Sequence, residues 1–375
     1  MSDPAAVVIP AGLLPSDGRF GSGPTRIRPA QLDALTAAGR TLLGTSHRQP
    51  PVRGLVQRVR EGLVALFGLP GDYLVVLGNG GTTAFWEVAA FGLISDRSQH
   101  LSFGEFSARF ARVTQAAPWL ADPAVIASDP GTHPLAAAET GIDAYALTHN
   151  ETSTGVAMPV RRVSGADEGA LVLVDATSAA GGIAVDPAEF DAYYFAPQKC
   201  FGSDGGLWIA LLSPAAIERA GQIAASGRYI PEFLSLQAAV NNSRQQQTWN
   251  TPSIATLILL AEQLDWMLGN GGMAWVTERT ATSSGILYTW AEKSPVAAPF
   301  VAGPAQRSPV VATIDFAEPV DAAALSAVLR ANGIVDTDSY RKLGRNQLRI
   351  GTFPAVEPSD VEALTACIDY VLDRI

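Results

Sequence analysis

A chain of 375 residues, 47% of them hydrophobic and 17% charged, is long enough for about two domains with a large core. The formal net charge of −10 argues against a nucleic-acid partner, because phosphate binding needs a basic surface, but a small anionic substrate needs only local arginines. The two cysteines, Cys200 and Cys367, are too few for a disulfide framework, and we expect both to be reduced and structural.

No stretch of the sequence combines a basic start with a long apolar run, and none is apolar over enough residues to span a bilayer. The four histidines show no metal-ligand spacing. We therefore expect a cytoplasmic protein with no membrane partner and no bound metal.

Residues 1–25 are rich in proline and glycine and indicate an extended N-terminal arm. Apolar periodicity predicts helices at 29–43 and 55–67, with a loop between them that ends in Pro50-Pro51. Short apolar strands then alternate with helical or loop segments, at 73–77, 100–103, 124–127, 144–148, 171–175, 192–196 and 207–212. Because these runs lack polar alternation, we expect a mainly parallel sheet that is covered on both faces.

The C-terminal third predicts a smaller α/β unit. Helical patterns occupy 253–266 and 273–292, and a linker loop is expected at 295–304. Strands at 310–314 and 347–350 and helices at 322–331 and 359–372 follow. The expected organisation is α/β, with an arm at 1–25, a large domain at 26–267 and a small C-terminal domain at 268–375.

Three strand ends carry groups that suggest a common site. The first strand leads into Gly78-Asn-Gly-Gly-Thr-Thr and a helix, which favours anion binding, although a plain tight turn is the alternative. Asp175 ends another strand, where a turn or cap role is the alternative. Lys199 follows a third; desolvation would lower its pKa and let it form a Schiff base, whereas a snorkelling lysine is the alternative. Together they suit pyridoxal phosphate.

Eight short stretches extend this interpretation across the chain: Gly21-Ser-Gly-Pro, Ser46-His-Arg, Gly80-Gly-Thr, Asn150-Glu-Thr, Asp175-Ala-Thr-Ser, Ala196-Pro-Gln-Lys, Trp249-Asn-Thr-Pro and Leu348-Arg-Ile. In this order the sequence resembles the class V aminotransferases of fold-type I. The resemblance implies a pyridoxal 5′-phosphate enzyme with a large domain built on a mainly parallel sheet and a smaller C-terminal α/β domain. It also implies a homodimer with shared active sites.

The resemblance assigns roles to individual residues. Lys199 would form the Schiff base and move the proton between the substrate Cα and the cofactor, and Asp175 would bind the pyridinium nitrogen. Phe106 would stack on the ring, where relatives carry tryptophan, and Thr152 would bind the phenolic oxygen. The cofactor phosphate would be held by Gly81, Thr82 and Gln198, joined by Asn250 and Thr251 of the other subunit.

The substrate side follows the same resemblance. Arg349 would take the substrate carboxylate, and His47 and Arg48 would face a substrate phosphate, because arginine forks match both anions. The sequence departs from the better-known family pattern at two points: Thr82 stands where that pattern has an arginine, and no His-Arg pair precedes Arg349. The candidates to compensate are Arg341, Lys342 and Arg345.

The implied reaction exchanges amino groups between glutamate and 3-phosphohydroxypyruvate, giving 2-oxoglutarate and O-phosphoserine for serine biosynthesis. A second role in pyridoxine biosynthesis stays open. The alternatives are an alanine–glyoxylate or serine–pyruvate aminotransferase and a cysteine desulfurase, which needs a reactive loop cysteine. A non-catalytic protein that keeps the fold for binding is the alternative from another class.

Overall fold

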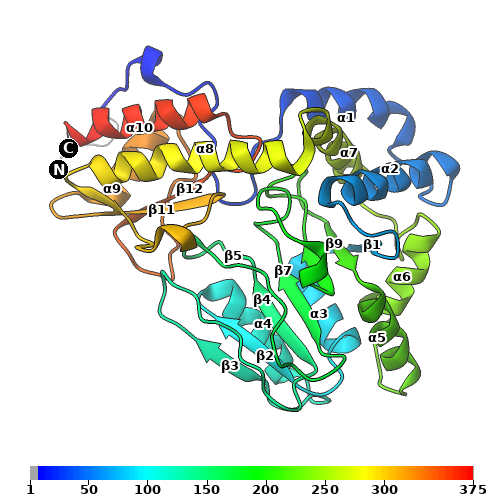
Figure 1. Cartoon of the computed structure of the whole chain (residues 1–375). Helices are drawn as coiled ribbons and strands as arrows, with labels where there is room; N and C mark the ends of the chain where they lie inside the picture. The colour runs from blue at the N-terminus through cyan, green and yellow to red at the C-terminus, as the bar shows by residue number, and fades with distance from the viewer. Residues whose placement is uncertain (1–6, 375) are drawn as a thin grey trace.

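The computed structural model describes residues 7–374, and its centre is a seven-stranded sheet with the strand order β1-β9-β8-β7-β4-β2-β3 (Figure 1). The strands are β1 (Leu74–Asn79), β2 (Ser98–Ser102), β3 (Ala124–Ala127), β4 (Ala144–Thr148), β7 (Leu171–Asp175), β8 (Ala192–Phe195) and β9 (Leu207–Leu212). All run parallel except β9, which is antiparallel to both of its neighbours. The prediction of a mainly parallel sheet is confirmed.

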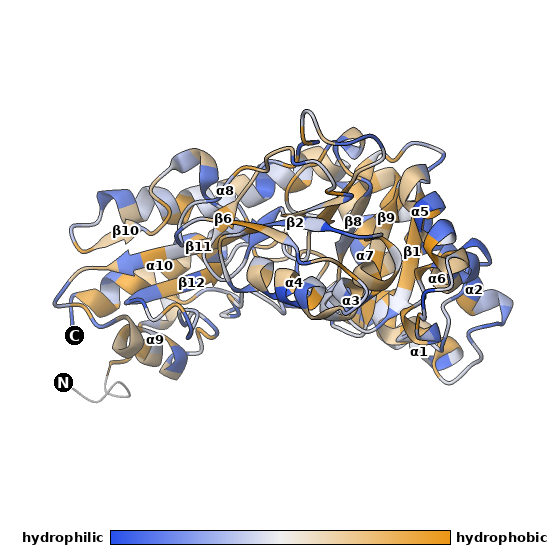
Figure 2. Cartoon of the chain, turned by 90° about the horizontal axis from the view of Figure 1, so that it is seen from below, coloured by the Kyte–Doolittle hydropathy of each residue, from blue (hydrophilic) through white to orange (hydrophobic). Residues whose placement is uncertain are grey.

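Alternate side chains of the central strands β1, β9, β8, β7 and β4 enter two separate hydrophobic clusters, which explains the lack of polar alternation there. On β8, Tyr193 and Phe195 pack with one cluster and Ala192 and Tyr194 with the other. The first cluster is covered by α1 (Pro29–Leu42), α2 (Pro50–Phe67) and α7 (Ile254–Gly269). The second is covered by α3 (Thr82–Gly92), α4 (Glu105–Ala116), α5 (Pro214–Ala225) and α6 (Leu236–Arg244). Figure 2 shows β1, β8 and β9 of this sheet as mostly hydrophobic.

The smaller unit is a sheet with helices, as predicted, but the sheet is antiparallel and has three strands where two were expected. Its strand order is β10-β11-β12, with β10 (Ala297–Pro299), β11 (Val311–Phe316) and β12 (Gln347–Gly351). Helices α9 (Ala322–Ala331) and α10 (Pro358–Leu372) pack on it through buried residues such as Leu325 and Leu364. The long helix α8 (Gly272–Lys293) runs across both units: Val276 belongs to a core cluster of the large unit and Leu287 to that of the small one (Figure 1).

The N-terminal segment lies along the small unit. Phe20 is fully buried in the core of that unit, and its carbonyl accepts a hydrogen bond of 2.7 Å from the amide of Gly351. A short 3₁₀ turn at Ala11–Leu13 precedes this contact. Residues 1–6 of the predicted arm lie outside the described residues. The boundary predicted at 267/268 falls in the last turn of α7, and this division stays a prediction because α8 contacts both units.

Two local predictions are corrected. Pro50-Pro51 begins α2 and does not end a loop, because proline needs no amide donor at the first helical positions. The expected linker at 295–304 contains strand β10, which pairs with β11. Among the described residues, no helix combines the length and apolar character that a membrane crossing requires.

Candidate active site

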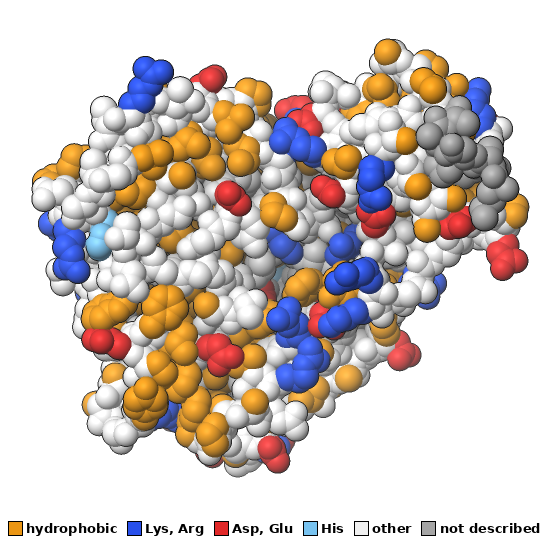
Figure 3. Space-filling view, turned by 180° about the vertical axis from the view of Figure 1, so that it is seen from behind, with side chains coloured by type: hydrophobic (Ala, Val, Ile, Leu, Met, Phe, Trp, Pro, Cys, Tyr) orange, Lys and Arg blue, Asp and Glu red, His pale blue; other side chains and the backbone are white. Residues whose placement is uncertain are grey.

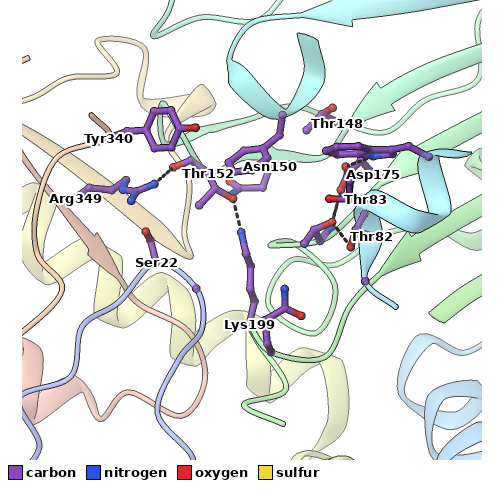
Figure 4. Close-up of a pocket in the computed structure, with 16 residues that line it drawn as sticks. Ser22, Thr82, Thr83, Thr148, Asn150, Thr152, Asp175, Lys199, Tyr340 and Arg349 are labelled. Atoms are coloured by element: carbon purple, nitrogen blue, oxygen red, sulfur yellow. Dashed lines mark hydrogen bonds between the residues drawn. The ribbon is translucent and has the colours of Figure 1, made fainter. Parts of the chain in front are cut away.

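A cavity of about 380 Å³ lies where the carboxyl ends of the parallel strands meet the small unit (Figure 4). Eight of the predicted site residues line it: Gly81, Thr82, Phe106, Thr152, Asp175, Gln198, Lys199 and Arg349. Arg349 comes from β12 of the small unit, whereas the others come from the large unit. The cavity therefore forms only where the two units meet.

Lys199 projects into this cavity from the turn after β8. It is only 8% exposed, and its Nζ donates a hydrogen bond of 2.8 Å to the hydroxyl of Thr152 (Figure 4). Nζ lies 5.4 Å from the centre of the Phe106 ring. Burial lowers the pKa of Lys199 to about 8, with the carboxylate of Asp175 acting in the opposite direction. The amine is therefore much closer to its neutral, nucleophilic form than a solvent-exposed lysine is.

The backbone next to Lys199 has to be glycine. Gly23 has a φ of +128°, and a Cβ built there would stand 2.6 Å from Cε of Lys199. An L side chain at this position would be strained by the backbone and would collide with the lysine. The N-terminal segment thus forms one wall of the cavity, with Ser22 beside Gly23.

Asp175 is the last residue of β7, and both oxygens of its carboxylate are held. Oδ2 accepts a hydrogen bond of 2.9 Å from the indole of Trp86, and Oδ1 accepts 2.9 Å and 2.6 Å bonds from the amide and hydroxyl of Thr177. Burial raises the pKa of Asp175, whereas these hydrogen bonds lower it. The carboxylate is thereby fixed in orientation within the cavity wall.

The predicted glycine-rich loop leads into the N-terminus of α3. Gly81 precedes the helix, and Thr82 and Thr83 are its first residues, whose amides have no intrahelical acceptor. All three line the cavity with Gln198, whose Oε1 is buried and has no hydrogen-bond partner among the described residues. Free amides at a helix N-terminus favour an anion such as a phosphate.

Arg349 approaches the cavity from the opposite side. Its Nη1 donates to the carbonyl of Thr152 at 3.3 Å, and its guanidinium lies 5.2 Å from the centre of the Tyr340 ring. Burial lowers its pKa. Its Nε has no hydrogen-bond partner and no carboxylate forms an ion pair with it within residues 7–374. A carboxylate in the cavity would supply the missing acceptor.

Four predicted residues form a cluster outside the lining of this cavity, next to Asn79 of the glycine-rich loop. Thr251 bonds His47 through its hydroxyl, 3.1 Å from Nδ1, and its carbonyl accepts from Asn79 at 2.9 Å. Arg48 and Asn250 are exposed beside them. None of the four lines the cavity of its own chain.

The three cations proposed to compensate for the missing family arginine are also outside the cavity lining. Lys342 forms an ion pair of 2.6 Å with Glu105. Arg345 pairs with Asp315, and its guanidinium lies 4.5 Å from the centre of the Phe300 ring. Arg341 is exposed. Two of the three are thus engaged with carboxylates of their own chain.

The remaining lining residues were not predicted as site residues: Ser22, Gly23, Thr83, Trp86, Thr148, Asn150, Thr177 and Tyr340. Several had a signal, since Gly23, Asn150 and Thr177 lie within the family-like stretches and Thr148 ends a buried strand. Trp86 had none, because in sequence it is one more apolar residue of a hydrophobic helix.

Comparison with known proteins agrees with this geometry. The family model described as "Aminotransferase class-V" matches residues 131–337, and the chain belongs to this family. A curated relative from Nocardioides sp., "Phosphoserine aminotransferase", is 64% identical over 371 residues, with 99% of each chain covered. One from Mycobacterium leprae, "Putative phosphoserine aminotransferase", is 61% identical, with 98% of this chain and 97% of the relative covered.

Solved structures share the fold. A phosphoserine aminotransferase from Cytophaga hutchinsonii superposes with a TM-score of 0.87 at 23% identity, covering 96% of this chain and 99% of the other. A pyridoxamine-pyruvate aminotransferase from Mesorhizobium loti gives a TM-score of 0.80 at 22% identity, covering 98% and 94%. These likenesses confirm the predicted fold-type I architecture.

The cofactor that this family implies is pyridoxal 5′-phosphate, and the cavity has the groups to receive it. The cofactor carries a phosphate, a ring nitrogen, a phenolic oxygen and an aldehyde. Facing the cavity are free amides at the start of α3, the fixed carboxylate of Asp175, the hydroxyl of Thr152 and the amine of Lys199. Oε1 of Gln198 and Nε of Arg349 also have no hydrogen-bond partner among the described residues, so each is free to bond a ligand.

Proposed function

We propose that this protein is a phosphoserine aminotransferase, which transfers an amino group from glutamate to 3-phosphohydroxypyruvate and yields O-phosphoserine and 2-oxoglutarate for serine biosynthesis. The observation that carries the chemistry is Lys199, a buried amine opposite a fixed carboxylate and a substrate-facing arginine. The identity of the substrate is supported by curated relatives of 60–64% identity that bear this name along nearly the whole chain. The proposal includes a cytoplasmic location.

When bound, pyridoxal 5′-phosphate supplies an aldehyde that reacts with amines and a ring that accepts electron density from the substrate Cα. Lys199 supplies the amine of the protein and is the base that removes and returns the proton at Cα. Its pKa of about 8 suits both tasks near neutral pH. Asp175 holds a proton on the ring nitrogen, and Trp86 and Thr177 keep its carboxylate in place.

Arg349 binds the α-carboxylate that both substrates share, because its Nε and outer nitrogens present a fork to the cavity. Phe106 and Tyr340, whose ring centres are 6.1 Å apart, line one side of the cavity. The second anionic group of each substrate differs: a carboxylate on glutamate and a phosphate on the keto acid. On the face in Figure 3, Lys and Arg side chains gather along the junction of the two units, which suits such dianions.

We further propose a homodimer in which His47, Arg48, Asn250 and Thr251 complete the cavity of the partner subunit. In support, these residues form one surface cluster outside the lining of their own cavity, and Nε2 of His47 has no hydrogen-bond partner among the described residues. Leu43 and Trp249 flank the cluster and are 46% and 37% exposed, which leaves apolar surface for a contact.

The reaction is tested by steady-state assays with two substrate pairs. We expect kcat/KM for glutamate and 3-phosphohydroxypyruvate to exceed that for alanine and glyoxylate by about a hundredfold or more, because a site built for a second anion leaves its cations unpaired with the smaller pair. Efficient turnover of alanine and glyoxylate without turnover of the phosphorylated keto acid would overturn the proposal. A cysteine desulfurase is not favoured, since burial raises the pKa of the Cys200 thiol and Cys367 lies in α10.

A further inference from the structure

Glu151, at the end of the short strand β5 (Asn150–Glu151), is a fully buried carboxylate that accepts five hydrogen bonds. Oε2 accepts from the amide of Phe106 at 3.1 Å and from the amide and hydroxyl of Ser107, both at 2.9 Å. Oε1 accepts from the amide of Ser153 at 3.1 Å and from its hydroxyl at 2.7 Å. The carboxylate therefore joins the start of α4 to the turn that follows β5.

The carboxylate of Glu151 is held by a helix N-terminus, and Lys199 and Arg349 interact with it through charge without forming an ion pair. Within residues 7–374 no lysine, arginine or histidine forms an ion pair with it. The first amides of α4 point at the carboxylate, and a negative charge is stabilised at a helix N-terminus. Gly104 makes this approach possible, because a Cβ there would stand 2.3 Å from Cγ of Glu151.

The two segments that Glu151 joins each contribute a residue to the cavity lining, Phe106 and Thr152. Phe106, on α4, faces the amine of Lys199 with its ring. Thr152, next to Glu151, accepts from Lys199 through its hydroxyl and from Arg349 through its carbonyl, and Figure 4 shows it between these two side chains. A shift of Glu151 would therefore move the aromatic wall relative to the lysine and the arginine together.

We propose that Glu151 is a positioning residue of the active site, which fixes Phe106 against Lys199 and Thr152 so that the cavity has one geometry. It is not among the residues that line the cavity. The inference rests on the proposed function, because it assigns the cavity to the cofactor.

The variant Glu151→Gln keeps the shape of the side chain and tests this role. Each carboxylate oxygen faces only donors, three on Oε2 and two on Oε1, so an amide nitrogen placed on either side opposes N–H and O–H groups. Loss of one charge-assisted hydrogen bond of this kind should change the equilibrium constant for cofactor binding by about tenfold to hundredfold.

The matched control is Asp191→Asn. Asp191 is also a buried carboxylate of the same unit, and it accepts from the amide of Val172 and the hydroxyl of Ser213, both at 2.9 Å. It differs from Glu151 in that Arg162 donates to it at 2.8 and 3.0 Å, and it lies at the amino end of β8. It does not line the cavity. Its substitution therefore lowers stability without reaching the site.

Two measurements on the cofactor-free protein come first. In Glu151→Gln we expect hydrogen–deuterium exchange at the amides of Phe106 and Ser107 to be about tenfold faster or more, and the affinity for pyridoxal phosphate to fall about tenfold or more. In Asp191→Asn neither should change by more than about twofold. Unchanged exchange and unchanged cofactor affinity in Glu151→Gln would overturn the inference.

Kinetics of the loaded enzyme give the second readout. Because both half-reactions use the same ring and lysine, Glu151→Gln should lower kcat/KM for glutamate and for the phosphorylated keto acid by a common factor; a loss for one substrate alone contradicts a positioning role. If Glu151→Gln does not fold, Ser153→Ala serves in its place, because it removes the Ser153 hydroxyl, one of the five donors to the carboxylate. An unchanged cofactor affinity in Ser153→Ala would then overturn the inference. Failure of the wild-type protein to turn over phosphorylated substrate would instead count against the proposed function.

Discussion

The indole Nε1 of Trp86 donates a 2.9 Å hydrogen bond to Oδ2 of Asp175, which connects helix α3 to the end of strand β7 directly beside the cavity. Both side chains are almost fully buried, so this bond is shielded from water. The helix whose first residues line the cavity therefore also orients the carboxylate that we propose binds the ring nitrogen.

Replacing Trp86 with phenylalanine should weaken cofactor binding. Asp175 would lose one of its three hydrogen bonds, and bonds to charged groups contribute about 1.5–3 kcal/mol, so the dissociation constant for pyridoxal phosphate should rise about tenfold or more. Titration of the cofactor-free protein, followed by absorbance, measures this constant. Trp119→Phe is the control, because its indole donates to the carbonyl of Ala90 outside the cavity; an equal effect in both variants would refute the assignment.

Lys199→Ala should abolish the covalent attachment of pyridoxal phosphate. The buried amine with a pKa of about 8 is the nucleophile that the cavity presents, whereas Lys293 lies at the end of α8 and Lys342 in an exposed ion pair. Borohydride reduction followed by peptide mass spectrometry locates the modified lysine. Label on Lys293 or Lys342 in place of Lys199 would be incompatible with this site.

The stability of the cofactor-free protein should depend on pH through Lys199. Its pKa is about 8 in the fold against an ordinary 10.5, so between these values the unfolded chain binds more protons than the folded one. The contribution of this lysine to the free energy of unfolding therefore rises with pH by up to about 3 kcal/mol across that window and is constant below it.

Urea unfolding of the wild-type protein and of Lys199→Met, compared from pH 7 to 10.5, isolates this contribution because other titrating groups cancel in the difference. We expect the wild type to gain stability relative to the variant as the pH rises. A difference that is independent of pH, or that runs the other way, would show that the lysine is not buried as a cation.

Asp360→Ala should destabilise the attachment of the N-terminal segment. Asp360 is buried at the start of α10, where it accepts from the amide and hydroxyl of Ser16, both at 2.7 Å, and from Arg26 at 2.8 Å. Breaking a buried pair of this kind costs about 3 kcal/mol. The exposed pair of Arg58 and Asp265 is the control, and Asp265→Ala should cost at most about 1 kcal/mol in the same urea series.

The shared active site should be visible by complementation. His47→Ala is expected to disable the cavity of the partner, whereas Lys199→Ala disables its own. After the two inactive variants are unfolded and refolded together, random pairing gives hybrid dimers with one intact site, and about a quarter of the wild-type activity should return. No recovery in a mixture that demonstrably contains hybrid dimers would place His47 in its own subunit's site or outside any site.

The strands were predicted well from the sequence, because a short apolar run such as Leu171–Asp175 between turn residues is typical of a buried strand. The direction of β9 could not be predicted, since Leu207–Leu212 has the same apolar character as its parallel neighbours. The strand-end residues Asp175 and Lys199 were found because polar groups directly after buried runs are uncommon. Trp86 escaped notice because its indole nitrogen acquires meaning only when α3 packs beside β7.

Residues whose partners are distant in sequence were harder still. The sequence places His47 in a loop before α2. Only the fold shows that His47 forms a hydrogen bond with Thr251, which lies 204 residues later in the sequence. Likewise the burial of Glu151 depends on Gly104, and nothing in Asn150-Glu-Thr alone indicates five donors around the carboxylate. Such contacts follow from three-dimensional packing and carry no local pattern.

The placement of Gly23 against Lys199 has a consequence for biosynthesis. The segment that carries Gly23 leaves the ribosome among the first residues, yet its neighbour Phe20 is bonded to Gly351, which is translated near the end. At about 5–20 residues per second, the stretch from Lys199 to Gly351 takes roughly 8–30 seconds to translate. During that time the lysine has no wall on this side, so the nascent chain holds every catalytic side chain of the large unit before it has a closed cavity.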